Sequence, residues 1–257
     1  MTVATAVAVH RSEAPPMYDP QTILDGIDEN TLPIMIGFGL AMVLQNIAMV
    51  TAVVMSHREH WISIPLPCTF LWVAHDLGVV ARFDTWFNTY DHWFLKLFWV
   101  GLVSAFLLEL VFLAQAVRYG QKELLPRGTR AQWATLVLAG AALTTLCWEY
   151  QKTIWDDPLY QALASTTLYV IPLFVVPLVL RRGSAVAQSP IVYGCFAGMV
   201  ILWWAVTAGA YGDAFRTWQY LTSGVAAFVT LTTTAAWIHR LRRGEMRTPA
   251  TLAGPIT

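Results

Sequence analysis

The chain has 257 residues, of which 56% are hydrophobic and 12% are charged. Soluble domains carry about 25% charged residues, so half that share places the protein in the membrane class. The 16 Lys and Arg residues balance the 16 Asp and Glu residues. Because a chain without net charge has no basic surface field, we expect no nucleic-acid partner.

Seven apolar segments follow a polar N-terminal segment, at residues 33–55, 62–80, 94–117, 132–149, 159–180, 190–208 and 219–239. Each is close to the ~20 residues that cross a hydrocarbon core. The early run VATAVAV has no cationic region before it, so we expect no signal peptide. We predict an all-α polytopic membrane protein, a seven-transmembrane-helix bundle. It comprises a polar segment at 1–32, the transmembrane domain at 33–240 and a basic tail at 241–257.

The charges of the connecting segments predict the orientation. With the N-terminus outside, the inner segments hold 11 of the 16 Lys and Arg residues. This bias follows the positive-inside rule, so we predict the N-terminus outside and the C-terminus in the cytoplasm. Most acids lie at or towards the outer face, where Asp76 and Glu149 are expected to converge on an outward-facing mouth.

Residues 62–80 contain the first candidate site. Thr69, Trp72 and Asp76 are spaced to share one face of a helix. An ionisable group in an apolar helix is costly to bury unpaired, which makes Asp76 a candidate catalytic residue. The alternative is a carboxylate that joins two helices. His75 points roughly 100° away and is predicted to bond a neighbour of Asp76 or to face another helix.

Two further acids are candidate catalytic residues. Glu109 lies about eight residues from the inner end of its segment, deeper than any other acid. It serves either a pocket floor or a contact between helices. Glu149 ends the segment 132–149, where Lys152 and Thr153 are spaced to pair with it. It is either part of the outer mouth or an interfacial cap.

The 12 Trp, 9 Tyr and 12 Phe residues suit interfacial belts and also a cavity for an apolar ligand. The candidate substrate-binding residues are Trp72, Trp148, Tyr150, Trp203, Trp204 and Tyr211.

Other functions lack the residues that they need. A retinal protein requires a lysine in its last helix, and residues 219–239 contain none. His57 and His60 have only Glu59 beside them, which is too few ligands for a metal site. The spacing of the three cysteines matches no zinc or haem motif. We therefore expect no metal and no cofactor.

Residues 65–68 read PLPC, and Trp72 and Asp76 follow them. With the chain length and the seven segments, this pattern resembles the small integral-membrane terpene cyclases of fungal meroterpenoid and indole-diterpene pathways. It covers about a tenth of the chain. In that family a glutamate directly follows the Trp and acts in protonation with an aspartate near the last helix. Here Val73 follows Trp72, the acid comes one turn later, and the acid nearest the last helix is Asp213.

The resemblance implies an isomerase or lyase that cyclises a lipophilic polyprene. Such chemistry needs a strong acid, aromatic faces that stabilise a carbocation, and a dry cavity. We expect Asp76 to be the acid, hydrogen-bonded to His75 or Glu149. The alternative is a non-enzymatic transporter or lipid-binding protein with an outward-facing acidic site. In either case the lipid bilayer is the expected partner, in a bacterial-type cell membrane or the ER membrane.

Overall fold

The computed structural model describes residues 17–164 and 166–244, and every regular element within these ranges is helical. The prediction of an all-α protein is confirmed. The elements are α1 (Pro20–Glu29), α2 (Thr31–Glu59), α3 (Leu66–Val80), the π-helical turn η1 (Thr85–Thr89), α4 (Trp93–Tyr119), α5 (Gln121–Leu124), α6 (Arg130–Trp155), α7 (Gln161–Ala164), α8 (Thr166–Arg182), α9 (Pro190–Ala210), the 3₁₀ turn η2 (Asp213–Phe215) and α10 (Trp218–Arg242).

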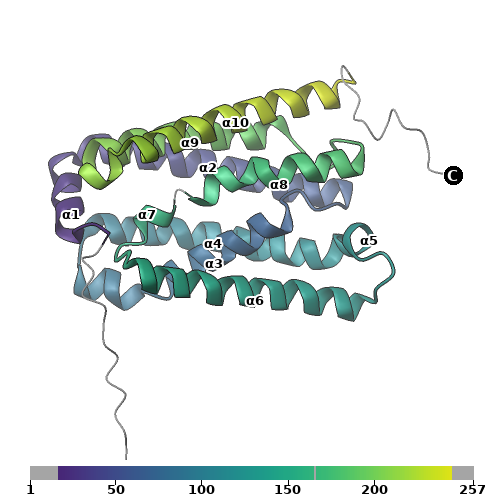
Figure 1. Ribbon diagram of the computed structural model, residues 1–257, viewed down its shortest axis with the longest axis horizontal. Helices are drawn as coiled ribbons and strands as arrows, with labels where there is room; N and C mark the ends of the chain where they lie inside the picture. Colours follow the sequence, from purple (N-terminus) through teal and green to yellow (C-terminus); the bar gives the residue numbers. More distant parts are fainter. Residues whose placement is uncertain (1–16, 165, 245–257) are drawn as a thin grey trace, which may run out of the picture.

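The long helices lie side by side and form an elongated bundle (Figure 1). Helix α2 packs against α4 and α9, and α10 packs against α8 and α9. Helix α3 packs against α4 and α8. These contacts close a ring in the order α2, α9, α10, α8, α3 and α4. Helix α6 lies outside the ring, against α3 and α4.

Within residues 17–164 and 166–244, five helices are long and apolar enough to cross a membrane, namely α2, α4, α6, α9 and α10. Many large apolar side chains on them are exposed, including Leu40, Leu97, Leu143 and Val229. Long helices with apolar exposed faces are typical of integral membrane proteins. The predicted membrane class is therefore supported by both the length and the surface of these helices.

Helices α3 and α8 are shorter, with 15 and 17 residues. Helix α3 begins at Leu66, four residues after the predicted start, with Pro65 as its N-cap and Pro67 in its first turn, where a proline removes no intrahelical hydrogen bond. Helix α8 contains Pro172 and Pro177 in its interior. The apolar segments 62–80 and 159–180 are thus helical over only part of their length.

The N-terminal segment contains an element that its polar composition did not predict. Helix α1 begins at Pro20, and the Asp19 carboxylate caps it by accepting hydrogen bonds from two backbone N–H groups. Its apolar side chains, such as Ile23 and Ile27, are buried where α1 contacts α2 and α9. Gly26 permits this packing, because a Cβ there would lie 2.0 Å from the backbone oxygen of Ala210.

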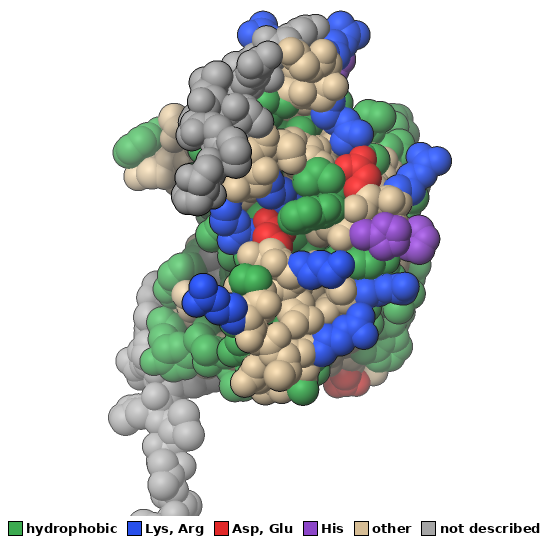
Figure 2. Space-filling model, turned by 90° about the vertical axis from the view of Figure 1, so that its right-hand side faces the viewer, with side chains coloured by type: hydrophobic (Ala, Val, Ile, Leu, Met, Phe, Trp, Pro, Cys, Tyr) green, Lys and Arg blue, Asp and Glu red, His purple; other side chains and the backbone are tan. Residues whose placement is uncertain are grey.

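The two ends of the bundle carry different charges. Helices α2, α4, α8 and α10 finish at one end, which we call the arginine-rich end. Figure 2 shows Lys and Arg side chains gathered over it around a few acids. Its cations are Arg58, Arg118, Lys122, Arg127, Arg130, Arg181, Arg182, Arg240, Arg242 and Arg243. At the opposite, acidic end lie Asp19, Asp25, Asp28, Glu29, Asp84, Asp91, Asp156 and Asp213. The parts of the predicted N-terminal segment and basic tail at 1–16 and 245–257 lie outside the described residues.

Candidate functional site

A cavity of about 50 Å³ lies at the centre of the helix ring. Its walls come from α2, α3, α4, α7, α8 and α9. The ionisable groups that line it are His75, Asp76 and Glu109. Aromatic and methionine side chains make up much of the remaining wall, namely Met49, Trp72, Phe98, Phe196, Met199 and Trp203. The cavity therefore places carboxyl groups among π faces and polarisable sulfur.

Helix α3 supplies the central acid and its aromatic neighbour. Trp72 and Asp76 both line the cavity, as their four-residue spacing predicted. The indole N–H of Trp72 donates to the backbone oxygen of Thr167 on α8 at 2.9 Å. This bond between α3 and α8 fixes the rotation of α3 and thereby aims Asp76 into the ring.

His75 bonds Asp76 directly. Its Nδ1 lies 2.6 Å from Oδ1 of Asp76, and each side chain is only 6% exposed. The imidazole also faces Trp148 of α6, with ring centroids 5.8 Å apart in an edge-to-face arrangement. The structure thus combines both predicted roles of His75, a bond to the acid and a face towards another helix.

Glu109 approaches Asp76 from α4. Its side chain is buried, and it lines the same cavity as Asp76. Two carboxylates that share an apolar cavity repel each other strongly, so the protein brings two acids together at a place where negative charge is costly. The structure places Glu109 in the wall of the cavity, and its predicted role there stays a prediction.

Three residues that line the cavity carry a buried polar atom without a partner. Nε2 of His75, Oε2 of Glu109 and Nε1 of Trp203 make no hydrogen bond within residues 17–164 and 166–244. A buried polar atom without a partner costs about 1–3 kcal/mol. Such atoms are expected where a ligand or water completes the hydrogen bonding.

Glu149 lies elsewhere, at the acidic end, and is not among the residues that line the cavity. Its carboxylate pairs with Arg82 at 3.0 Å and accepts a hydrogen bond from the Tyr160 hydroxyl at 2.9 Å. The predicted outer mouth shared by Asp76 and Glu149 is therefore wrong for this conformation. The physical reason is that Arg82, in the turn just after α3, provides a charged partner away from the ring centre.

The predicted pairing of Glu149 with Lys152 is also wrong. Nζ of Lys152 lies 2.5 Å from the carboxylate of Asp157, and these side chains are 1% and 0% exposed. Asp157 also accepts a hydrogen bond from the Tyr18 hydroxyl. Burial raises the pKa of Tyr18, and the negative charge of Asp157 raises it further, so this hydroxyl remains a donor. Thr153 donates to the backbone oxygen of Glu149 and not to its side chain.

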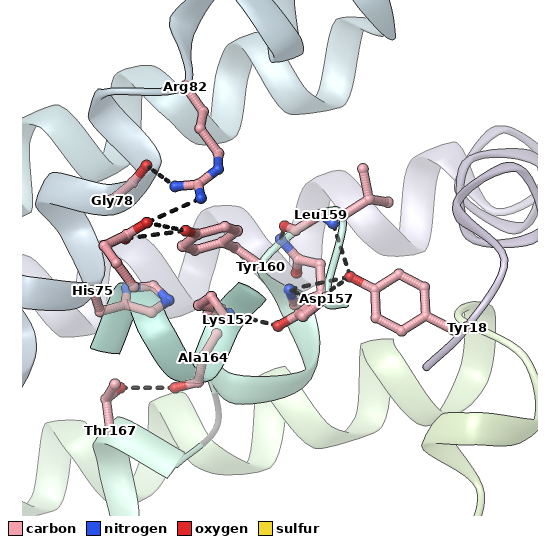
Figure 3. Close-up of polar contacts among 12 residues, drawn as sticks. Tyr18, His75, Gly78, Arg82, Lys152, Asp157, Leu159, Tyr160, Ala164 and Thr167 are labelled. Atoms are coloured by element: carbon pink, nitrogen blue, oxygen red, sulfur yellow. Dashed lines mark hydrogen bonds and ion pairs between the residues drawn. The ribbon is translucent and has the colours of Figure 1, made fainter. Parts of the chain in front are cut away.

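These groups form one cluster, which we call the acidic-end network. It consists of Glu149 and of five residues that Figure 3 labels, namely Tyr18, Arg82, Lys152, Asp157 and Tyr160. The ring of Tyr160 lies between two cations, with the Arg82 guanidinium 4.0 Å and the Lys152 ammonium 3.9 Å from its centroid. The network joins the end of α3, the end of α6 and the segment before α7.

The six predicted aromatic residues are dispersed. Trp72 and Trp203 line the cavity. Trp148 lies behind His75, and Tyr150 is 68% exposed on α6. The remaining two pack outside the cavity, with Trp204 stacked on Tyr220 and Tyr211 bonded to Gln161.

Phe98 and Phe196 line the cavity but were not predicted. A helical signal for them exists in the sequence. Phe98, Leu102 and Glu109 are spaced to share one face of α4, and Phe196 precedes Trp203 by two turns on α9. Helical spacing from Glu109 on α4 and from Trp203 on α9 therefore identifies these two wall residues.

Among the described side chains, no group of three or more His, Cys, Asp and Glu residues is placed to hold a metal ion. Comparisons of the chain with family models, with curated proteins and with solved structures find no match. The protein is thus a helical membrane protein with a buried carboxyl pair at its centre, and its function has to be inferred from that geometry.

Proposed function

We propose that the protein is an integral membrane enzyme of the terpene or meroterpenoid cyclase type. It acts on a lipophilic substrate and starts cyclisation by protonating an alkene or epoxide. One observation carries the proposal: the Asp76–Glu109 carboxyl pair lies inside a cavity whose walls include Trp72, Trp203 and two Phe residues. This arrangement combines a proton donor with π faces for a carbocation.

The chemistry assigns a role to each group. The shared proton of Asp76 and Glu109 passes to the substrate, and the negative charge that remains is stabilised by the imidazole of His75. The faces of Trp72 and Trp203 stabilise the cation while rings close. A carbon next to the final cation then returns a proton to the carboxylate, so the reaction is an isomerisation without net consumption of acid.

The size of the cavity limits what this conformation holds. About 10–15 Å³ is needed for one water, so 50 Å³ accommodates a few waters and no polyprenyl chain. Substrate binding therefore requires the walls to separate. We expect this separation between α3 and α8. Pro172 removes a backbone hydrogen-bond donor from α8 beside the cavity residues Thr167 and Leu168, which weakens the helix at this point.

The small cavity also supports a second candidate, a proton-coupled transporter. In that case the carboxyl pair binds and releases a proton between the oppositely charged ends of the bundle. Such a transporter needs a path for water through the helix ring, but it needs no space for a polyprenyl chain. The two candidates differ in what Asp76 does during turnover.

The test is the Asp76→Asn variant. The amide keeps the shape but has no acidic proton, so we expect conversion of a plain or epoxidised polyprenyl substrate to fall by about 10²–10⁴-fold. Asp76→Glu should keep part of the activity, and His75→Ala should be milder. Asp84→Asn, an exposed acid at the acidic end, is the matched control. Full turnover by a correctly inserted Asp76→Asn protein would overturn the acid mechanism and leave the transporter as the leading candidate.

We further propose seven membrane spans, with α3 and α8 added to the five long helices, the N-terminus outside and the C-terminus inside. The gathering of Lys and Arg at the arginine-rich end supports this orientation. Single cysteines at Asn88 and Arg127, in a background without the native cysteines, should react with an impermeant maleimide from opposite sides of the membrane. Reaction from the same side would contradict the proposed topology.

A further inference from the structure

An apolar groove of about 440 Å³ lies on the surface between α3, α5 and α8, away from the central cavity. Its lining includes Pro65, Phe70 and Leu124 on one side and Phe174, Pro177 and Arg181 on the other. A groove of this volume is in the range that binds a small ligand. Because α3 and α8 are apolar helices, its walls suit a hydrocarbon chain.

The mouth of the groove lies at the arginine-rich end and carries excess positive charge. Glu123 of α5 is already held by Arg182, whose Nε and Nη2 lie 3.0 and 2.8 Å from its two oxygens. Arg181 is a second guanidinium on the same carboxylate, at 2.7 Å. Two guanidinium groups thus share one carboxylate, so one positive charge is not neutralised within this cluster and can bind an anionic ligand.

The two arginines differ in accessibility. The side chain of Arg182 is 2% exposed and also bonds the backbone oxygens of Ile62 and Val186. Arg181 is 49% exposed and lines the groove. The charge that is free to bind therefore belongs to Arg181, at the point where an apolar groove begins.

We propose that this groove binds an anionic phospholipid of the surrounding bilayer, with its phosphate at Arg181 and one acyl chain along the groove. From Arg181 to Phe174 is about 10 Å along a helix at 1.5 Å per residue, which fits the first part of a chain within one leaflet. The inference does not depend on the proposed enzymatic activity.

The test uses the full chain, purified in detergent and offered equal amounts of dioleoyl phosphatidylglycerol and dioleoyl phosphatidylcholine. Native mass spectrometry then counts the retained lipids. One basic residue near an anionic lipid predicts about a fivefold preference for phosphatidylglycerol. Arg181→Gln should lose most of that preference, and Arg181→Lys should keep it. Arg127→Gln is the matched control, since Arg127 is exposed at the same end and does not line the groove.

A second experiment locates the acyl chain of the bound lipid. Phosphatidylglycerol with a diazirine in the middle of its acyl chain should cross-link to Phe70 and Phe174. Labelling spread evenly to exposed residues of other helices, such as Leu40 and Val229, would overturn the proposal, as would equal retention of both lipids or an equal loss in Arg127→Gln. Stronger retention of a polyprenyl phosphate than of phosphatidylglycerol would also overturn it, by assigning the groove to an isoprenoid ligand.

Discussion

The central cavity and the acidic-end network both bury ionisable groups, but they differ in how these groups are paired. In the network, Arg82 pairs with Glu149 and Lys152 pairs with Asp157. In the cavity, the His75 imidazole bonds Asp76, and Nε2 of His75 and Oε2 of Glu109 lack partners among the described residues.

This difference separates a structural from a functional use of buried charge. Paired charges with additional hydrogen bonds hold segments together, and removing one partner leaves the other exposed to the apolar interior. Unpaired polar atoms are retained against their cost where a ligand completes them. We therefore interpret the acidic-end network as a structural joint and the cavity as the proposed functional site.

The largest expected effect is on stability, from Lys152→Met. The change leaves the Asp157 carboxylate buried without its cation, and breaking a buried ion pair costs about 3–5 kcal/mol. Thermal unfolding of the detergent-solubilised protein measures the loss. The double variant Lys152→Met with Asp157→Leu should recover much of the stability, because it removes both charges. If Lys152→Met kept normal stability but lost turnover, the acidic-end network would have a functional and not a structural role.

Glu109→Gln should act on turnover and leave the fold intact. The amide still fills the space beside Asp76 but removes one of the two groups that share a proton, so we expect turnover to fall by about 10²-fold. The pH–rate profile should change from that of a coupled pair to that of a single acid. A merely structural Glu109 would lower the melting temperature without changing the shape of this profile.

Glu149→Gln tests the same comparison from the other side. Glu149 and Arg82 are both about a third exposed, and pairs of this kind contribute about 1 kcal/mol or less. We expect a small decrease in melting temperature with turnover unchanged. Lost turnover in a protein of normal stability would restore the predicted catalytic role of Glu149.

The smallest expected effect concerns pH at the arginine-rich end. Burial alone would raise the pKa of Glu123, but Arg182 and Arg181 lower it below its ordinary value of 4.5. A lowered folded-state pKa means that the stabilisation is complete above pH 4.5 and is lost as the pH falls below it. Comparing the melting temperatures of wild type and Glu123→Gln across this range should show a steeper decline in the wild type.

Much of the helical framework follows from the sequence alone. The apolar segments predicted the long helices and the membrane class, and the four-residue spacing placed Trp72 and Asp76 on one face of α3. Charge counting separated the Arg-rich connections from the acidic ones. These properties are local: hydropathy, helical periodicity and capping residues act within a few turns of chain.

The partners of the acids were decided by the tertiary structure. Glu149 and Lys152 are close in sequence, yet Glu149 pairs with Arg82, 67 residues earlier in the chain, and Lys152 pairs with Asp157, five residues further on. Helix α1 forms within a polar segment because its side chains Ile23 and Ile27 are buried against the helix bundle. Helices α4 and α9 are apolar nearly all round, so their sequences carry little signal about which face turns inwards. Only the packing of the ring rotated Glu109 towards Asp76 and left Glu149 outside, because that choice depends on contacts between helices far apart in the chain.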